Sequence, residues 1–184
     1  APIDWVTKDQ LDFVNNKVVL PALKGMENKG AIFNGCLYPG LMIDGDEVKV
    51  LEFNARFGDP EAEVYMRLLD SDLYDILLAC AENRLDPSMV KWKQGYATTV
   101  VLASEGYPGS YTRGVPITGI DEAEKQDDIV IFHAGTFVKD GQLVTAGGRV
   151  LNVTSTCQTL QEALDKAYSA ITLIHFDGMQ CRKD

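Results

Sequence analysis

The segment from residue 44 to residue 61 constrains the fold of this chain more than any other stretch. Asp44-Gly45-Asp46 has the composition of a tight turn, and residues 47–54 follow it as a strand-like run. The residues before the turn, 31–43, are also apolar and strand-like. We therefore expect a β-hairpin in which residues 47–54 form the second strand.

Polar groups recur at every second position near the end of this strand. Because successive side chains of a strand point to opposite faces, alternation places Glu52, Asn54 and Arg56 on one face in steps of about 7 Å. Two hard oxygen donors suit Mg²⁺, and the planar cation beside them suits a phosphate. The pattern is typical of the floor of a nucleotide site, although a solvated strand face would show the same alternation.

A sharp break follows the strand. Gly58 ends it, Asp59 is suited to capping a helix, Pro60 fits the first helical position and Glu61 falls in the first turn. A strand with polar groups that runs into a helix N-terminus is a common place for anion chemistry.

Composition excludes several classes of function. The chain has 184 residues, 46% of them hydrophobic, and a formal net charge of −10. It can build a core, but it lacks the basic surface that nucleic acids and anionic membranes need. There is no apolar run long enough to span a bilayer, and the four cysteines are far apart. We expect free thiols and a cytoplasmic protein that binds neither nucleic acid nor membrane.

Periodicity predicts the remaining elements. Capping boxes at Thr7–Gln10 and Thr159–Glu162 open helices, the first kinked or divided at Pro21 and the second reaching about residue 174. A hairpin turn is expected at residues 139–142. Further helices are expected at 60–69 and 72–85, and strands at 96–103, 129–134, 143–146 and 149–154.

Six motifs in order resemble one enzyme family, the phosphoribosylamine–glycine ligases. They are Gly35–Ile43 with Val50–Glu61, Ser71–Tyr74, Gly106–Gly109, Phe132–Thr136, Gly147–Leu151 and Cys181–Asp184. Each motif alone is weak, but together they cover essentially the whole chain.

The resemblance implies an α+β fold in two parts. Residues 1–90 are similar to the C-terminal part of an ATP-grasp domain, and residues 91–184 to a small β-rich C-terminal domain with one packed helix. Family members are considerably longer. The resemblance therefore implies that an N-terminal portion, which holds adenine, precedes these residues in the enzyme.

The implied activity is the ATP-dependent ligation of glycine to 5-phosphoribosylamine in purine biosynthesis. The expected intermediate is glycyl phosphate, and the products are glycinamide ribonucleotide, ADP and phosphate. Metal and guanidinium groups then provide most of the catalysis, because charge builds on the transferring phosphoryl oxygens. Mg²⁺ or Mn²⁺ is the implied cofactor.

Family positions map onto named residues of this sequence. Glu52 and Asn54 match metal ligands, and Arg56 matches the group that stabilises the transferring phosphate, with an ion pair to Glu61 or Glu63 as the alternative. Gly58, Asp59, Glu61, Gly148 and Arg149 match substrate-proximal positions. Ala62-Glu63 differs from the residues usual in the family at these positions. For His133 a structural role is favoured over general-base chemistry, which is kept as the alternative.

Two other interpretations stay open. The chain by itself is expected to be a non-catalytic module, because the groups that bind adenine and most of the triphosphate lie elsewhere. Another ATP-grasp carboxylate–amine ligase with a similar ending, such as a carboxylase-type enzyme, is the second alternative.

Overall fold

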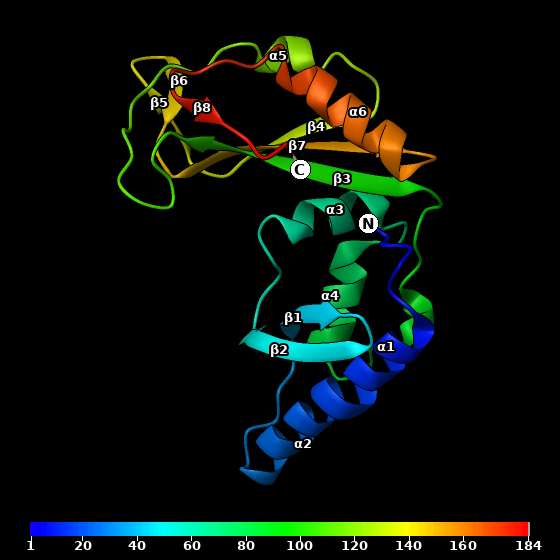
Figure 1. The fold of residues 1–184 in the computed structure, drawn as a ribbon. Coiled ribbons are helices and arrows are strands. Elements are labelled where there is room, and N and C mark those ends of the chain that lie inside the picture. Colours follow the sequence, from blue (N-terminus) through cyan, green and yellow to red (C-terminus); the bar gives the residue numbers. More distant parts are fainter. Residues whose placement is uncertain (184) are drawn as a thin grey trace. The chain divides into compact units, whose positions relative to one another are not determined.

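The computed structural model describes residues 1–183, so the last residue of the Cys181–Asp184 match lies outside the described part. The chain divides into two compact units (Figure 1). Unit 1 comprises Ala1, residues 59–68 and the chain from residue 93 onward, and unit 2 comprises residues 2–58 and 69–92. The predicted division between residues 90 and 91 stays a prediction.

Unit 1 is built on a four-stranded antiparallel sheet with the strand order β4-β7-β3-β8 and a separate β5–β6 hairpin. Its elements are α3 (Glu61–Leu68), β3 (Tyr96–Ser104), α5 (Ile120–Ala123), β4 (Ile129–His133), β5 (Thr136–Lys139), β6 (Gln142–Thr145), β7 (Arg149–Cys157), α6 (Leu160–Ile171) and β8 (Met179–Gln180).

Helices α6 and α3 cover opposite faces of this sheet, as Figure 1 shows for unit 1. The main core lies under α6, where small helix residues such as Ala167 and Ala170 let the helix approach Leu102, Leu151 and Val153 of the sheet. On the other face, Val64 and Leu68 of α3 pack on Ala97. Both contacts follow from helix faces that are apolar at spacings of three and four residues.

Unit 2 consists of a helical run, a two-stranded antiparallel hairpin and a further helix. Its elements are α1 (Lys8–Phe13), the π-helical segment η1 (Val14–Val19), α2 (Leu20–Asn28), β1 (Tyr38–Asp44), β2 (Glu47–Asn54), α4 (Leu73–Ala81) and the short 3₁₀ helix η2 (Pro87–Met89).

The two expected capping boxes and the two expected hairpin turns are confirmed. Thr7 and Thr159 each form the reciprocal capping box, and the two hairpins turn at residues 45–46 and 140–141 with positive φ at Gly45, Asp140 and Gly141. The expected break at Pro21 takes the form of a widened π-helical turn immediately before it. Proline supplies no backbone N–H and its ring clashes with the preceding turn, which accounts for that position.

Some predicted elements are longer than the observed ones; α6, for example, ends at Ile171 rather than at about residue 174. Residues 31–37 are irregular rather than extended, because β2 is long enough to pair only with residues 38–44 and Gly35 has a φ of +145°. Helix α4 ends at Ala81 rather than at residue 85, since Asn83 adopts the left-handed conformation that ends helices. Strands β5 and β8 are additional to those predicted.

Buried apolar residues are distributed unevenly between the units. Among the described residues, the two core clusters belong to unit 1, whereas Val18 and Ala79 are the buried apolar side chains of unit 2. Unit 2 also exposes large apolar side chains, among them Trp5 (65% exposed), Ile32 (78%) and Leu51 (64%). Unit 2 therefore has little core of its own. Its two-stranded sheet is expected to be only marginally stable by itself.

Candidate active site

The predicted metal ligands lie side by side at the end of β2. The Nδ2 of Asn54 donates a hydrogen bond to Oε1 of Glu52 at 3.1 Å, and both side chains belong to unit 2. The expected shared face is therefore confirmed for these two residues. Coordination by Asn54 needs its amide turned so that Oδ1 faces the cation, because a protonated nitrogen cannot be a metal ligand.

The partner strand makes room for the Glu52 side chain. Gly40 of β1 lies opposite Glu52 in the hairpin register, and a Cβ added at Gly40 would lie 3.2 Å from Cγ of Glu52. The register shifts at this point, since Leu41 faces Val50 and leaves Leu51 as an extra residue in β2. Such bulges bend and twist a strand, and they are frequent next to active sites.

These two residues fit a divalent cation as a partial ligand set. A carboxylate and an amide oxygen are hard donors of the kind that Mg²⁺ and Mn²⁺ accept. Within residues 1–183 there is no cluster of three or more His, Cys, Asp or Glu side chains that could hold a metal. Phosphate oxygens and water would have to complete the coordination.

Arg56 lies beyond the strand rather than on it. Strand β2 ends at Asn54, so the alternation that relates Glu52 to Asn54 does not extend to Arg56, and this part of the sequence prediction is wrong. Its Nη1 donates to the carbonyl oxygen of Phe57 at 2.8 Å. A guanidinium has five N–H donors, so this bond leaves most of them for a phosphate.

Two of the predicted substrate-proximal residues bind each other within unit 1. Arg149 donates from Nη1 to the carbonyl oxygen of Asp59 at 2.9 Å, and its Nη2 lies 3.2 Å from Oδ2 of the Asp59 carboxylate. The side chains are 37% and 46% exposed, so the pair keeps access to solvent. Glu61 opens α3 two residues later, whereas Gly58, which is buried, belongs to unit 2.

Gly148 lies directly beneath two tyrosine rings. A Cβ added there would lie 2.2 Å from Cδ2 of Tyr107 and 3.0 Å from Cε1 of Tyr111, so only glycine fits without displacing the rings. The two rings meet edge to face at 6.5 Å, and Arg113 lies over the Tyr111 ring at 5.5 Å. The aromatic pair therefore packs directly on the residue before Arg149, and sequence reasoning missed it.

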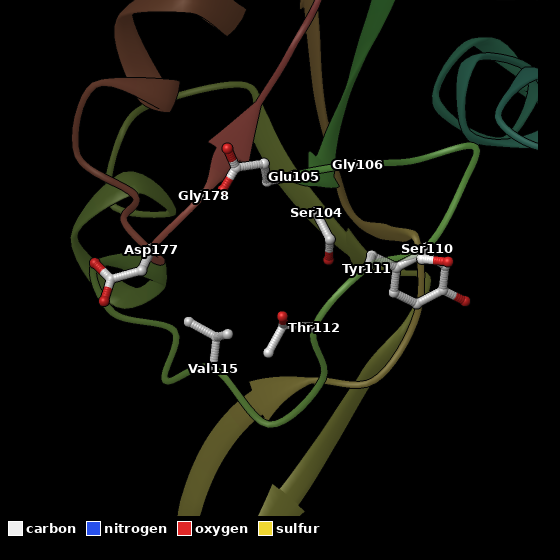
Figure 2. Close-up of a pocket in the computed structure, with 9 residues that line it drawn as sticks. All are labelled: Ser104, Glu105, Gly106, Ser110, Tyr111, Thr112, Val115, Asp177 and Gly178. Carbon is white, nitrogen blue, oxygen red and sulfur yellow. The ribbon is translucent and has the colours of Figure 1, made fainter.

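A cavity of about 580 Å³ adjoins these residues in unit 1. Tyr111 forms part of its wall, and Ser104, which donates from Oγ to the Gly147 carbonyl, forms another. Figure 2 shows the hydroxyls of Ser104 and Thr112 facing the middle of the hollow, while the Asp177 carboxylate points away from it. The lining is polar and carries no cationic side chain.

Glu63, which differs from the residue usual at this position in the family, has a structural partner. Oε1 of Glu63, on α3, accepts a 2.6 Å hydrogen bond from Nδ2 of Asn152, which is 1% exposed on β7. Oε2 of Glu63 and Oδ1 of Asn152 are buried without a hydrogen-bond partner in the protein. An Asn within the otherwise apolar run 150–153 was the available signal for this contact.

His133 and the cysteines have no catalytic arrangement in the described residues. Nδ1 of His133, which is exposed at the end of β4, lies 2.9 Å from the Thr136 hydroxyl. All four cysteines are free thiols, as expected. Burial, reinforced by the nearby Cys80, raises the pKa of the Cys36 thiol, which disfavours its nucleophilic form at neutral pH.

Two models of protein domains match separate parts of the chain. The family model for the phosphoribosylglycinamide synthetase ATP-grasp (A) domain matches residues 1–62, and the model for the C domain of the same synthetase matches residues 97–184. These two models belong to one enzyme family and match the chain in the order that its motifs predict.

Individual relatives match the whole chain. It is 46% identical over 185 residues to trifunctional purine biosynthetic protein adenosine-3 of Gallus gallus, and 44% identical over 184 residues to phosphoribosylamine–glycine ligase of Chlorobaculum tepidum. Both matches cover 100% of this chain, but 18% and 43% of the respective relatives.

A solved structure shares the fold. The crystal structure of phosphoribosylamine–glycine ligase from Thermotoga maritima matches with a TM-score of 0.85 at 35% identity, covering 100% of this chain and 44% of that one. This match confirms the predicted α+β fold and the predicted resemblance. The chain belongs to the phosphoribosylglycinamide synthetase family.

Proposed function

We propose that this chain is the C-terminal part of an ATP-dependent ligase that joins glycine to 5-phosphoribosylamine. The products are glycinamide ribonucleotide, ADP and phosphate, formed through glycyl phosphate. The observation that carries the proposal is the adjacency of the Glu52 and Asn54 side chains on β2, in a chain that matches both domain models of the family.

The metal and the phosphoryl group are assigned to residues of unit 2. Glu52 and Asn54 hold Mg²⁺ or Mn²⁺, which when bound neutralises charge on the nucleotide phosphates. Arg56 donates its remaining N–H groups to the oxygens of the transferring phosphoryl group, while its bond to the Phe57 carbonyl restricts the side chain.

The substrates are assigned to residues of unit 1. Asp59 and Arg149 present a carboxylate and a guanidinium together, which matches a ligand carrying both an ammonium and an anionic group. Glu61 adds a second carboxylate for the ammonium of glycine or of the amino sugar. Gly148, on which the tyrosine pair packs, is assigned a place beside Arg149, and Gly58, which is buried in unit 2, a place beside Asp59 in the chain.

The exposed apolar side chains of unit 2 support the proposal of a further, N-terminal portion of the enzyme. A longer protein with an N-terminal portion would cover apolar side chains such as Trp5, Leu11 and Leu51, each more than half exposed in this chain. That portion supplies the adenine pocket. The domain boundary near residue 90 and a cytoplasmic location complete the proposal.

Neither membranes nor nucleic acids are proposed as partners. No helix in the described residues has the length and apolar character needed to cross a bilayer. The net charge of −10 opposes binding to polyanions.

The test is a ligation assay with the full-length protein. We expect ADP, phosphate and a product with the mass of glycinamide ribonucleotide, all dependent on ATP, glycine and 5-phosphoribosylamine together. Replacing glycine by bicarbonate or another carboxylate should abolish product, which separates this enzyme from carboxylase-type relatives. Turnover with another carboxylate but not with glycine would overturn the assignment.

The 184-residue chain alone is the matched control. Because the nucleotide-binding portion is assigned to the rest of the protein, we expect no ligation by this chain under the same conditions. Ligation by the isolated chain at a rate near that of the full-length protein would contradict that assignment.

A further inference from the structure

A second cavity, of about 250 Å³, lies in unit 1 at the C-terminal end of α3. It is separate from the residues assigned to ligation. Its polar lining includes Arg67, Lys93, Gln94, Asp128 and Gln158.

The charge of this cavity is opposite to that of the chain. Arg67 and Lys93 contribute two cations, whereas Asp128 is the acid among the lining residues and is bound by Lys166, with Nζ and Oδ2 2.9 Å apart. That contact with Asp128 raises the pKa of Lys166, to which the neighbouring Cys157 thiol also contributes. The cavity is thus a local cationic site in a chain of net charge −10.

The guanidinium of Arg67, a residue that lines the cavity, is only partly satisfied within the protein. Nε of Arg67 is buried and makes no hydrogen bond within the protein, and a buried unsatisfied donor costs free energy. Lys93 reaches toward the same residue, with Nζ 3.4 Å from the Arg67 carbonyl oxygen. A guanidinium beside an ammonium is a combination that recognises phosphate oxygens.

The cavity borders the two segments through which the chain leaves unit 1 and returns to it. Lys93 N donates to the carbonyl oxygen of Leu68 at 2.7 Å, and Asp70 N donates to that of Lys91 at 2.9 Å. Leu69 and Trp92 pair between them as an antiparallel bridge. A ligand held by Arg67 and Lys93 would therefore contact both segments.

We propose that this cavity binds a phosphate group, either inorganic phosphate or the phosphate of a small phosphomonoester. The volume suits a ligand of that size, and the anion would accept hydrogen bonds from the Nη groups of Arg67 and the ammonium of Lys93, both of which line the cavity. The site is formed by residues of β7, α3 and the segment 93–96, and none of its lining residues is assigned to ligation. The proposal therefore does not depend on the proposed ligation chemistry.

Cys157 supplies a local reporter, because it lines the same cavity. In the full-length protein, the rate of its alkylation by iodoacetamide is followed by peptide mass mapping as inorganic phosphate is added at constant ionic strength. We expect phosphate at millimolar concentration to slow alkylation of Cys157 severalfold and to leave Cys181 unchanged. Glycerol phosphate in place of inorganic phosphate distinguishes an ester ligand from the free ion.

Matched variants identify the residues that bind. Lys93→Gln and Arg67→Gln each remove one charged donor, so the phosphate concentration for half-protection should rise about tenfold or more. Lys24→Gln removes an exposed lysine of α2 that pairs with Glu27, and should leave protection unchanged. Glu52→Gln should also leave it unchanged, which separates this site from the ligation site.

Two results would overturn the proposal. One is equal protection of Cys157 in Lys93→Gln, Arg67→Gln and Lys24→Gln. The other is an alkylation rate that does not respond to inorganic phosphate or to glycerol phosphate at concentrations up to tens of millimolar. Circular dichroism of each variant shows that it is folded, and Lys93 is exposed enough that its substitution leaves the core intact.

Discussion

At the scale of single residues, Gly148 has a strict steric requirement near the candidate site. Gly148→Ala places a methyl group against the Tyr107 ring, so the ring must move. We expect a loss of about 1–3 kcal/mol in the free energy of unfolding, as for other overpacked sites. Chemical denaturation of the 184-residue chain, followed by a signal from unit 1, measures this free energy.

The matched control for this substitution is Gly25→Ala. Gly25 lies in α2, and a Cβ added there meets nothing within 4 Å. Alanine is the better helix former, so this variant should be neutral or slightly more stable. Equal effects of the two substitutions would show that the tyrosine contact does not constrain Gly148.

The positions of single side chains could be predicted from the sequence only where they lie on a regular strand or helix. The adjacency of Glu52 and Asn54 follows from alternation along a strand. Arg56 was misplaced because nothing in the sequence marks the end of pairing at Asn54. Asn152 was missed because its partner Glu63 is 89 positions away in the chain, and contacts of that kind arise from tertiary packing.

At the scale of elements, the contact between Glu63 and Asn152 joins α3 to β7. Glu63→Gln supplies an amide that can donate to Oδ1 of Asn152, which has no partner, while its own oxygen still accepts from Nδ2. We expect Glu63→Gln to be neutral or stabilising. Asn152→Ala should cost about 1–3 kcal/mol, because it leaves the Glu63 carboxylate buried without a donor.

Thermal and denaturant unfolding of both variants check this prediction. If Glu63→Gln destabilised unit 1 as much as Asn152→Ala, the hydrogen bond would require the ionised carboxylate, and the amide argument would be wrong. Val64→Ala, which trims the apolar contact of α3 with Ala97, gives the scale of a packing loss on the same helix.

Element starts were predictable where a local signal determines them. The capping boxes at Thr7 and Thr159 fix helix starts through bonds between residues three apart. Helix and strand ends were less predictable. Residues 31–37 are apolar enough for a strand but have no partner, and pairing is a property of the fold rather than of the segment.

At the scale of the whole molecule, the two units differ in how much core they hold. Because unit 2 buries few apolar side chains, its local stability in the isolated 184-residue chain should be low. Amide hydrogen exchange should show strong protection for β3, β7 and α6, and weak protection for β1 and β2. Protection of β1 and β2 equal to that of β3 and β7 would contradict this expectation.

The same comparison in the full-length protein tests the proposed N-terminal portion. If that portion covers the apolar side chains of unit 2, exchange of the β1 and β2 amides should slow relative to the isolated chain, while exchange in β3 and β7 changes little. The division of the chain into interleaved units could not be predicted from the sequence. The chain passes between the units after residues 58, 68 and 92, and the residues at these points have no composition in common.

The proposal that β2 holds the catalytic cation is tested most directly by substituting two glutamates of this strand, one at a time, in the full-length protein. Glu52→Gln should lower kcat/KM for ligation about a hundredfold or more and raise the Mg²⁺ concentration needed for half-maximal rate. Glu47→Gln removes an exposed carboxylate that pairs with Lys49, and should stay within about twofold of the parent. Ligation by Glu52→Gln at the rate of Glu47→Gln, with the same Mg²⁺ dependence, would contradict the assignment.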